Sequence, residues 1–591
     1  STPIDYKKLD TIIKGDLKLS VDVNLISKDR SEIKATVDAS KLLISTKAIE
    51  KKKGDALKIT VLAESDLKNK IVIKDITLVL IDELLKINGA VDNFSSDKPE
   101  VDLTAKPSNK FDVSALAKVM KSLKDYKMSG KLDGSISIKG NLPKEGTSNS
   151  LGVIGNIDAT NTEIQSGSFS KTNKMPLKVM INVDTDLKSM DINQFQVFLH
   201  TAEDKDLLAL AVKGAIKNFS DEKPIYDLNV EKLNVNLSYF GKQIPALAKY
   251  PVAGSLSSRA KITGSMSPLP IIDLQAEYKD DVNKNNVNLK VSNTEKSRNL
   301  VVADISSSYI NLTPYLPPVE KSTKAKASKG SAAASASGVS APTSKSDEDM
   351  VVLKKETIES VKKALDKYSI KLNAKVDKLI SRELTINNFI LNGSFNKDEI
   401  AINKMNLSLL KGDMAGNLKV GLNVSNPTYA GKLDLKGIKV KDAADIFMPG
   451  IKGVIDGVVS FGVDLNTSGY SMKPIKKNMV AKGNFAFNNF VYSGQELNSL
   501  INDKLKDKLG ALGYSGDKKI LGTNPGWETV QGTFNIKDGK INIEQLLAKE
   551  KEYEATGKGE LTFNEYMDMF IDVTVPYKNI PYEAIKVEGK D

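Results

Sequence analysis

Hydrophobic and polar residues alternate with a period of two along most of the chain. Near the N-terminus this alternation places five apolar residues on one side of a single segment, namely Leu17, Leu19, Val21, Val23 and Leu25. The same pattern returns in residues 33–39 and 57–63. One apolar face and one polar face are typical of half-buried antiparallel strands. We therefore expect a mainly β protein built on antiparallel sheet.

The pattern is clearest between Gly532 and Val575. The Asp538-Gly539 pair predicts a hairpin in which Ile536 pairs with Ile541 and Phe534 pairs with Ile543. Two more strands continue this meander, and their apolar faces carry Leu561 and Phe563 on one and Met569, Ile571, Val573 and Val575 on the other. Nothing helical in this stretch could cover that face. A second sheet, another part of the same curled sheet, or a ligand must do so.

Three segments share one plan, in which a short amphipathic helix is followed by a glycine and an alternating strand. The helices are expected at residues 113–123, 244–249 and 442–447, and the strands follow Gly130, Gly254 and Gly453. The first of these strands carries Ile136 and Ile138. Such a repeat favours an elongated array of similar units over several unrelated globules.

Residues 319–350 are rich in Ser, Ala, Lys and Gly and have little to bury, which predicts a flexible linker or a long surface loop. The strand pattern is alike on both sides, so we expect β-groove repeats in residues 1–318 and a related β region in residues 351–591. The second region should open with a helix at 357–368. It should contain a strand with Leu418, Val420, Leu422 and Val424 on one face.

The most amphipathic helix is expected at residues 495–512, where leucine and isoleucine recur every three or four residues. We interpret it as a cap on the end of a sheet. Its lysines leave a membrane-surface helix as the alternative.

The net charge of +11 would suggest an anionic partner, but it comes almost wholly from lysine. Arginine, whose flat fork suits phosphates and bases, occurs only at Arg30, Arg259, Arg298 and Arg382. We interpret the lysines as a solvating coat that also discourages aggregation at sheet edges, and expect no nucleic-acid partner. The absence of cysteine excludes disulfides, thiol nucleophiles and cysteine-ligated metals.

The residues that usually carry catalysis are scarce. His200 is the only histidine, so no two-histidine metal motif exists, and no nucleophile elbow, phosphate-binding glycine loop or EF-hand is present. His200 and the single tryptophan, Trp527 in a turn-rich stretch, are interpreted as structural. Paired carboxylates stay open, because the sequence does not show which acids meet in space. We expect no enzyme activity, no cofactor and no metal.

The C-terminal half resembles the C-terminal region of the AsmA family. The resemblance rests on Gly453–Leu465, Gly483–Phe487, Phe490–Tyr492, the helix at 495–512, Phe534–Ile541, Gly557–Leu561 and Asp572–Val575; Tyr250–Leu256 resembles the family's middle region. The family implies a bacterial envelope protein anchored in the inner membrane. It also implies relatedness to proteins whose curled sheet forms an apolar groove that carries phospholipid between membranes.

The expected function is therefore non-enzymatic. The twisted sheet would curl into an apolar groove that binds a phospholipid or other acyl lipid and supports membrane biogenesis with envelope partner proteins. No run of 18 apolar residues occurs, and Ser1-Thr2-Pro3 opens no signal peptide, so a periplasm-facing chain would have an anchor upstream of Ser1 that is absent or removed. The alternative is a self-associating β scaffold at the cell surface or outside the cell, in which two sheets bury their apolar faces against each other.

Overall fold

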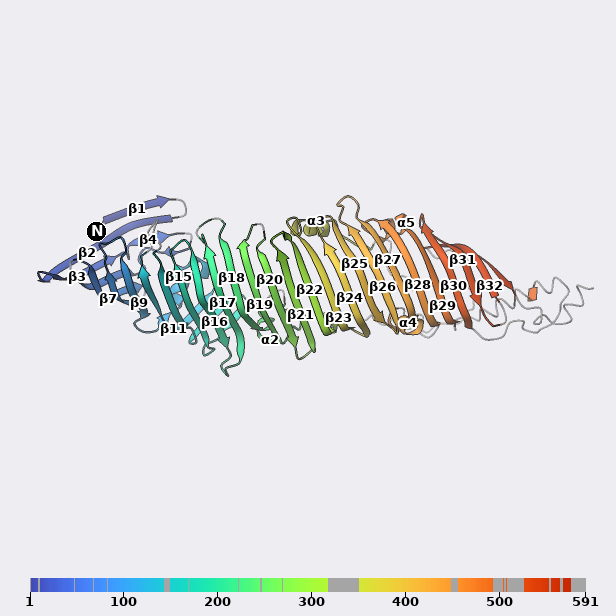
Figure 1. Ribbon diagram of the computed structural model, residues 1–591, viewed down its shortest axis with the longest axis horizontal. Helices are drawn as coiled ribbons and strands as arrows, with labels where there is room; N and C mark the ends of the chain where they lie inside the picture. Colours follow the sequence, from blue (N-terminus) through green and yellow to red (C-terminus); the bar gives the residue numbers. More distant parts are fainter. Residues whose placement is uncertain are drawn as a thin grey trace, which may run out of the picture. The chain divides into compact units, whose positions relative to one another are not determined.

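The computed structural model describes residues 2–8, 11–46, 48–66, 68–81, 83–142, 149–167, 169–219, 221, 223–244, 247–267, 269–316, 350–447, 455–492, 503, 506–507, 526–551, 554–563 and 567–574. Of these residues, 68% lie in strands and 9% in helices, which confirms a mainly β protein (Figure 1). The chain divides into two compact units, residues 1–298 and 299–591, which are described separately. The expected linker at 319–350 and helix at 495–512 lie almost wholly outside the described residues.

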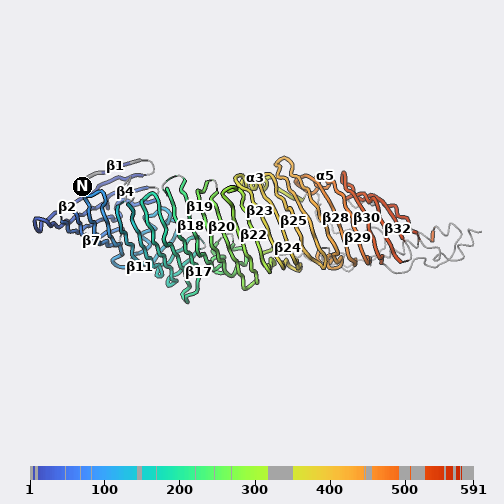
Figure 2. Tube along the Cα trace, in the orientation of Figure 1, coloured from blue at the N-terminus to red at the C-terminus, as the bar shows by residue number. Residues whose placement is uncertain are grey.

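The first unit is an open antiparallel sheet. Its described strands pair in the order β2, β3, β6, β7, β8, β9, β11, β12 and β15 to β21. In addition, β1 and β4 pair with β2 (Figure 2), β5 pairs with β4, β10 and β13 pair with β11, and β14 pairs with β13. The strands are β1 (Thr2–Lys8), β2 (Thr11–Ser27), β3 (Arg30–Asp38), β4 (Leu42–Ser45), β5 (Glu50–Lys51), β6 (Leu57–Ser65), β7 (Lys70–Leu80), β8 (Glu83–Asp92), β9 (Glu100–Pro107), β10 (Phe111–Asp112), β11 (Lys127–Asn141), β12 (Leu151–Asp158), β13 (Thr162–Ser166), β14 (Phe169–Lys171), β15 (Leu177–Thr185), β16 (Met190–His200), β17 (Asp206–Lys217), β18 (Ile225–Asn236), β19 (Ser255–Ser265), β20 (Ile271–Asp280) and β21 (Asn285–Thr294).

The second unit is a sheet whose strands pair in chain order. The strands are β22 (Ser297–Asn311), β23 (Ser369–Ser381), β24 (Leu384–Phe395), β25 (Glu399–Leu409), β26 (Gly412–Gly421), β27 (Thr428–Lys439), β28 (Ile455–Ser468), β29 (Val480–Tyr492), β30 (Gly526–Lys537), β31 (Lys540–Lys549), β32 (Glu554–Thr562) and β33 (Met567–Thr574). No described pairing joins β22 to β33, so the sheet does not close on itself.

The second unit contains one described parallel pair, β22 with β23, in a sheet that was expected to be antiparallel. Leu300, near the start of β22, lies opposite Ser369 at the start of β23. The chain therefore leaves β22 at one end of the sheet and returns to the other end before β23 begins. A hairpin cannot make such a connection, so a parallel pair needs a longer crossover here.

The helices are short and lie at the ends of strands (Figure 1). They are α1 (Ser114–Val119), α2 (Leu237–Phe240), α3 (Lys355–Ala364), α4 (Val440–Phe447) and α5 (Met472–Asn478), with 3₁₀ turns at Lys121–Leu123 and Thr313–Tyr315. The predictions at 113–123, 357–368 and 442–447 are confirmed within a few residues. For the prediction at 244–249, residues 245–246 lie outside the described residues and the others form hydrogen-bonded turns. The described helix α2 precedes this range and begins at Leu237, where the Asn236 side chain accepts a hydrogen bond from the Tyr239 N–H.

The predicted helix, glycine and strand repeat has a geometric basis at its glycines. Gly130 and Gly254 adopt φ of +89° and +85°, and a Cβ there would approach a neighbouring carbonyl oxygen to 2.3 Å and 1.8 Å. Only glycine tolerates both conditions. Gly254 lies directly before β19, whereas Gly130 lies inside β11, so only Gly254 marks the point where the chain enters the next strand.

The first unit also contains a longer duplication, which recurs after about 120 residues. Lys51 Nζ donates to the carbonyl oxygens of Ser40, Leu42 and Lys52 at 3.0, 2.8 and 3.0 Å. Lys171 Nζ donates to the carbonyls at the same offsets, those of Thr160, Thr162 and Thr172, at 3.1, 2.6 and 3.2 Å. Both lysines are 1% exposed, and burial lowers the pKa of each ammonium group. We call residues 42–51 the first flap and residues 162–171 the second flap.

Matching turns accompany the two flaps. The Asp66 carboxylate accepts hydrogen bonds from the N–H groups of Lys68, Asn69 and Lys70 at 2.9, 2.7 and 2.8 Å. Asp186 accepts from Lys188 and Ser189 in the corresponding turn. Backbone hydrogen bonds to the charged form lower the pKa of both carboxyl groups.

We predict that replacing Gly214 with Ala lowers the free energy of unfolding by more than about 1 kcal/mol. Its φ is +135°, and a Cβ would lie 2.0 Å from the Asp227 carbonyl oxygen. Gly155→Ala is the matched control, because its Cβ would meet nothing closer than 3.6 Å. Urea unfolding measures both variants. Equal stability of the two variants would contradict the conformation assigned to Gly214.

We also predict that Asp66 contributes to acid unfolding. Its folded pKa lies below that of the unfolded chain, so its contribution is complete above the ordinary carboxyl pKa and is lost as the pH falls through the folded value. Asp66→Asn keeps an oxygen acceptor that does not titrate. The variant should therefore lose less stability than the wild type between about pH 5 and about pH 2. Urea unfolding at both pH values checks this, and an identical loss would argue against it.

Candidate functional site

Strand register collects the apolar residues of the second unit on one face of the sheet. Leu418 lies between Ile402 and Gly431, and Gly431 lies opposite Leu465. Farther along, Phe534 pairs with Ile543 and Ile536 with Ile541, as the sequence predicts. Ile541 in turn pairs with Leu561, and Gly559 pairs with Met569. We call this side the apolar face of the second unit.

Glycines on this face let large side chains lie flat against the sheet. A Cβ on Gly483 would lie 2.4 Å from the Phe534 ring, and a Cβ on Gly532 would lie 2.8 Å from the Phe485 ring. Phe534 stacks on Phe461 with ring centroids 5.8 Å apart. The result is a low aromatic layer rather than a row of projecting side chains.

A shallow hollow of about 200 Å³ lies on the same face. Gly431 forms its floor, and the side chains of Ile402, Met405, Leu418 and Leu433 are among its walls. Leu418 is 37% exposed. The hollow is therefore open to solvent although most of its lining is apolar.

The first unit presents a second apolar face, built by the same register rule. Val23 pairs with Ile33, and Leu103 pairs with Ile138. The face continues through successive pairs to Val291 on β21, for example Phe195 with Val212 and Leu228 with Ile262. In a β-sandwich, a second sheet would pack against such a face and bury it. Here Leu19 and Leu25 are 66% and 73% exposed, and no described segment covers them.

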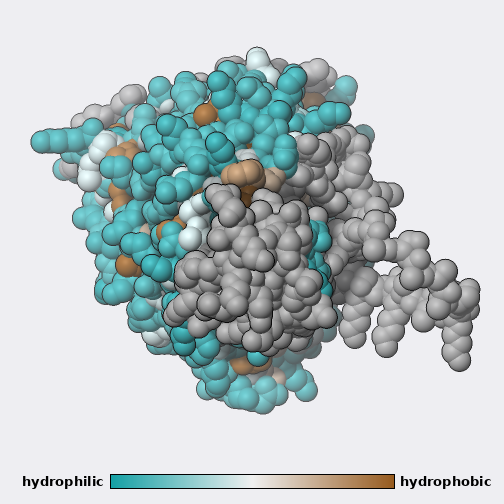
Figure 3. Space-filling model, turned by 90° about the vertical axis from the view of Figure 1, so that its right-hand side faces the viewer, coloured by the Kyte–Doolittle hydropathy of each residue, from teal (hydrophilic) through white to brown (hydrophobic). Residues whose placement is uncertain are grey.

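The opposite faces of both sheets are polar. Cross-strand partners there include Lys432 with Asp464 at 2.9 Å and Lys540 with Glu560 at 2.7 Å. A hollow of about 420 Å³ on this side of the first unit is lined partly by Asp133, Asp158 and Lys178. In the end-on view of Figure 3, the coloured part of the surface is mostly hydrophilic, with small hydrophobic groups between. Water can therefore hydrate the polar face of each sheet, whereas it cannot form hydrogen bonds with the side chains of the apolar face.

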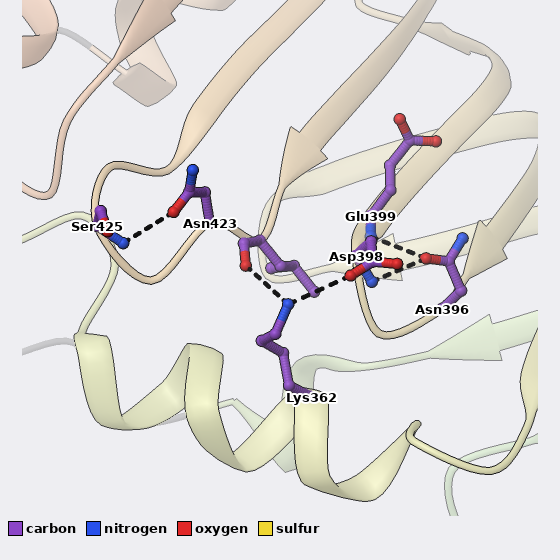
Figure 4. Close-up of polar contacts among 7 residues, drawn as sticks. Lys362, Asn396, Asp398, Glu399, Asn423 and Ser425 are labelled. Atoms are coloured by element: carbon purple, nitrogen blue, oxygen red, sulfur yellow. Dashed lines mark hydrogen bonds and ion pairs between the residues drawn. The ribbon is translucent and has the colours of Figure 1, made fainter.

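Helices close both ends of the apolar face in the second unit. Lys362 of α3 reaches the Asp398 carboxylate at 3.3 Å and the Leu422 carbonyl oxygen at 3.4 Å, which ties the helix to two strand turns (Figure 4). Ile358 of α3 and Ile475 of α5 are buried at this end, and Ala444 of α4 is buried at the other. Between these ends, no described segment covers Leu418, which is 37% exposed.

Tyr429 is an exception among the apolar residues. It lies on the apolar face opposite Val420, and its buried hydroxyl has no hydrogen-bond partner among the described residues. Burial raises the pKa of this hydroxyl. The nearby Tyr470 hydroxyl, by contrast, donates to the Val424 carbonyl oxygen.

The structure places the predicted groove residues in three environments. Strongly exposed positions are Leu19, Val21, Val23, Leu25, Ile136, Leu418 and Ile571; partly buried ones are Leu17, Ile138, Val420, Val424, Ile541, Ile543, Leu561, Phe563 and Met569. Phe534 and Ile536 are buried in a cluster with Ala481, so protein covers them instead of an open groove. Leu422 is buried in the turn after β26, which ends at Gly421 and therefore does not carry Leu422 and Val424 as strand residues. Val573 pairs with Ala555 through its backbone, and Val575 lies outside the described residues.

Sequence reasoning missed the two buried lysines and Tyr429. A signal for the lysines exists, since Asp38-Ala39-Ser40 and Asp158-Ala159-Thr160 stand at the same distance before Lys51 and Lys171. Nothing in the sequence marks Tyr429, because its missing partner depends on what surrounds it in space.

The other singled-out residues occupy structural positions. His200 ends β16, and its Nδ1 lies 3.3 Å from carboxylate oxygens of Asp204 and Asp206. Trp527 is buried, as expected for a packing residue, although it lies in β30 and not in a loop. Within the described ranges, no group of acidic or histidine side chains could hold a metal ion, and no helix is long and apolar enough to cross a membrane.

Comparison with known proteins gives no match: no protein-family model fits the chain, and no curated protein or solved structure is similar to it. The geometry of the two apolar faces is therefore the basis for a functional proposal.

We predict that Tyr429→Phe raises the free energy of unfolding by about 1 kcal/mol, because a buried hydroxyl without a partner is unfavourable. Tyr470→Phe is the matched control and should lower it by about 1 kcal/mol, since a hydrogen bond is lost. Thermal or urea unfolding of the full chain measures both. A loss of stability in Tyr429→Phe would show that its hydroxyl has a stabilising partner.

Proposed function

We propose that this protein binds acyl chains along its apolar faces and supports the movement or homeostasis of phospholipid between membranes. The observation that carries the proposal is the register of the strands, which joins apolar residues from successive strands into one face per unit. Leu418 and Ile571 remain 37% and 52% exposed on that face in the second unit.

An apolar face that no described segment covers calls for an occupant. Soluble proteins rarely expose continuous apolar patches larger than a few hundred Å², and larger patches mark sites of interaction. Acyl chains suit the face because they are apolar and deformable and need no polar recognition. Each buried methylene contributes about 0.8 kcal/mol.

The hollow over Gly431 supports the same ligand class. Its walls are methyl and methylene groups of Ile402, Leu418 and Leu433, and its floor lacks a side chain. A flexible hydrocarbon can fill such a depression without a specific hydrogen bond. The resemblance to the AsmA family leads to the same proposal and adds a location in the bacterial cell envelope.

The second candidate function is a self-associating scaffold. Two exposed apolar strands at sheet edges favour it, since Val21 and Leu25 on β2 and Phe570 and Ile571 on β33 are exposed. Edge strands of this kind can pair with another chain. Sedimentation that depends on protein concentration, together with an absence of bound lipid, would support this reading over the lipid carrier.

We predict that lipid copurifies with the full chain and that Leu418→Asp reduces it by about tenfold or more. A carboxylate facing acyl chains loses its hydration, at a cost that exceeds the 1.4 kcal/mol or so that a tenfold change represents. Lipid extraction and native mass spectrometry of protein purified in mild detergent give the measurement.

Lys419→Asp is the matched control, because it places the same charge one residue away on the polar face. It should leave bound lipid unchanged. Equal lipid in the wild type and Leu418→Asp, or none in the wild type, would count against the proposal.

A further inference from the structure

The second flap and α2 meet at one end of the apolar face in the first unit. Phe169 of the flap stacks on Phe240 of α2, with ring centroids 6.2 Å apart and planes within 4°. The Tyr239 hydroxyl donates to the Ser170 carbonyl oxygen, and the Ser170 N–H donates to Gln243 Oε1 at 3.4 Å. The flap and the helix are thus joined by one ring stack and two hydrogen bonds.

These aromatic rings seal the face at that end. Tyr239 and Phe240 pack against a cluster of Met175, Leu199 and Leu207, and Leu199 is only 2% exposed. Ile136, on the same face but away from this end, is 40% exposed. The face therefore runs from a closed end at the aromatic rings to an open stretch farther along the strands.

Lys171 fixes the flap to the main sheet. Its Nζ bonds the carbonyl oxygens of Thr160 and Thr162, which lie where the chain leaves β12 and enters the flap. Phe169 stands two residues before Lys171 on the same short strand, β14. Loss of the ammonium group would release the strand that carries the stacked ring.

We propose that Phe169 and Phe240 form a stop for the methyl end of a bound acyl chain, and that Lys171 is the positioning residue that holds this stop in place. The inference rests on the proposed acyl-binding function and adds an orientation and a limit on chain length. The tail points toward the rings. The polar end group lies toward the opposite ends of the strands, where water keeps it solvated.

The dimensions suit a long-chain acyl group. β15, which leads away from the sealed end, has 9 residues and spans about 26 Å at about 3.3 Å per residue. An extended acyl chain lying along this strand meets the rings once it exceeds the available length. The stop therefore selects against chains that are too long.

The first flap provides an internal control. It has the same lysine cage, by which we mean a buried lysine ammonium group that donates to three backbone carbonyl oxygens, here at Lys51. It contacts the next helical turn through a hydrogen bond from the Lys121 N–H to the Ala48 carbonyl oxygen at 2.9 Å. The residue corresponding to Phe169 is Ile49, which is 42% exposed. The cage is repeated, whereas the aromatic stack is not.

The test is displacement of a fluorescent fatty acid from the full chain by saturated fatty acids of about 12 to about 22 carbons. The wild type should bind best at one chain length and more weakly beyond it. Phe240→Ala and Lys171→Met should both move the optimum to longer chains. Phe198→Ala, which removes a ring from the polar face of β16, and Lys51→Met should leave the optimum where it is.

Hydrogen exchange measured on the same variants separates the positioning role from the stop. Lys171→Met should lose protection in residues 162–171, while Phe198→Ala should keep it. A changed optimum without that loss would overturn the role of Lys171. If Lys171→Met fails to fold by circular dichroism, Phe240→Ala alone decides whether the stop exists.

The outcomes also separate this inference from the proposed function. Binding with one unchanged optimum in the wild type and Phe240→Ala would overturn the stop and leave acyl binding intact. Absence of any displacement would overturn both.

Discussion

The structure depends on the hydrogen-bonded register between neighbouring strands. Side chains alternate across a strand, so a slip of one residue would move a whole apolar set to the polar face. The set is kept together because Ile402 pairs with Leu418, and Gly431 lies opposite both Leu418 and Leu465. Register shifts at several pairs, such as between Ile543 and Leu546, absorb an extra residue without mixing the faces.

Each unit then manages the ends of its apolar face with short elements. In the second unit these are α3, α5 and α4, and in the first unit they include α2 and the two flaps. The lysine cages hold the flaps in place by hydrogen bonds to the backbone in addition to hydrophobic packing. A single ammonium group on Lys171 donates hydrogen bonds to three backbone carbonyl oxygens, those of Thr160, Thr162 and Thr172.

Buried and exposed positions on the apolar faces indicate how ligand binding and stability are divided among the described residues. Residues such as Leu199 and Phe534 are buried by protein and hold the sheet together. Residues such as Leu418 and Ile571 remain exposed, so they are the ones available to a ligand. The predicted set of groove residues combined both kinds, because alternation marks the face of a strand and says nothing about what lies above it.

Alternation and turn chemistry in the sequence by themselves determined the strands, their two faces and the hairpin that pairs Phe534 with Ile543. These features are local, since a period of two and an Asp-Gly turn act within a few residues. Only the tertiary structure decided the parallel pairing of β22 with β23, the burial of Leu422 beside Lys362 and the matching cages of Lys51 and Lys171. Each of these joins groups far apart or out of pattern along the chain, and their free energy depends on distance, burial and partners in space, which no local periodicity encodes.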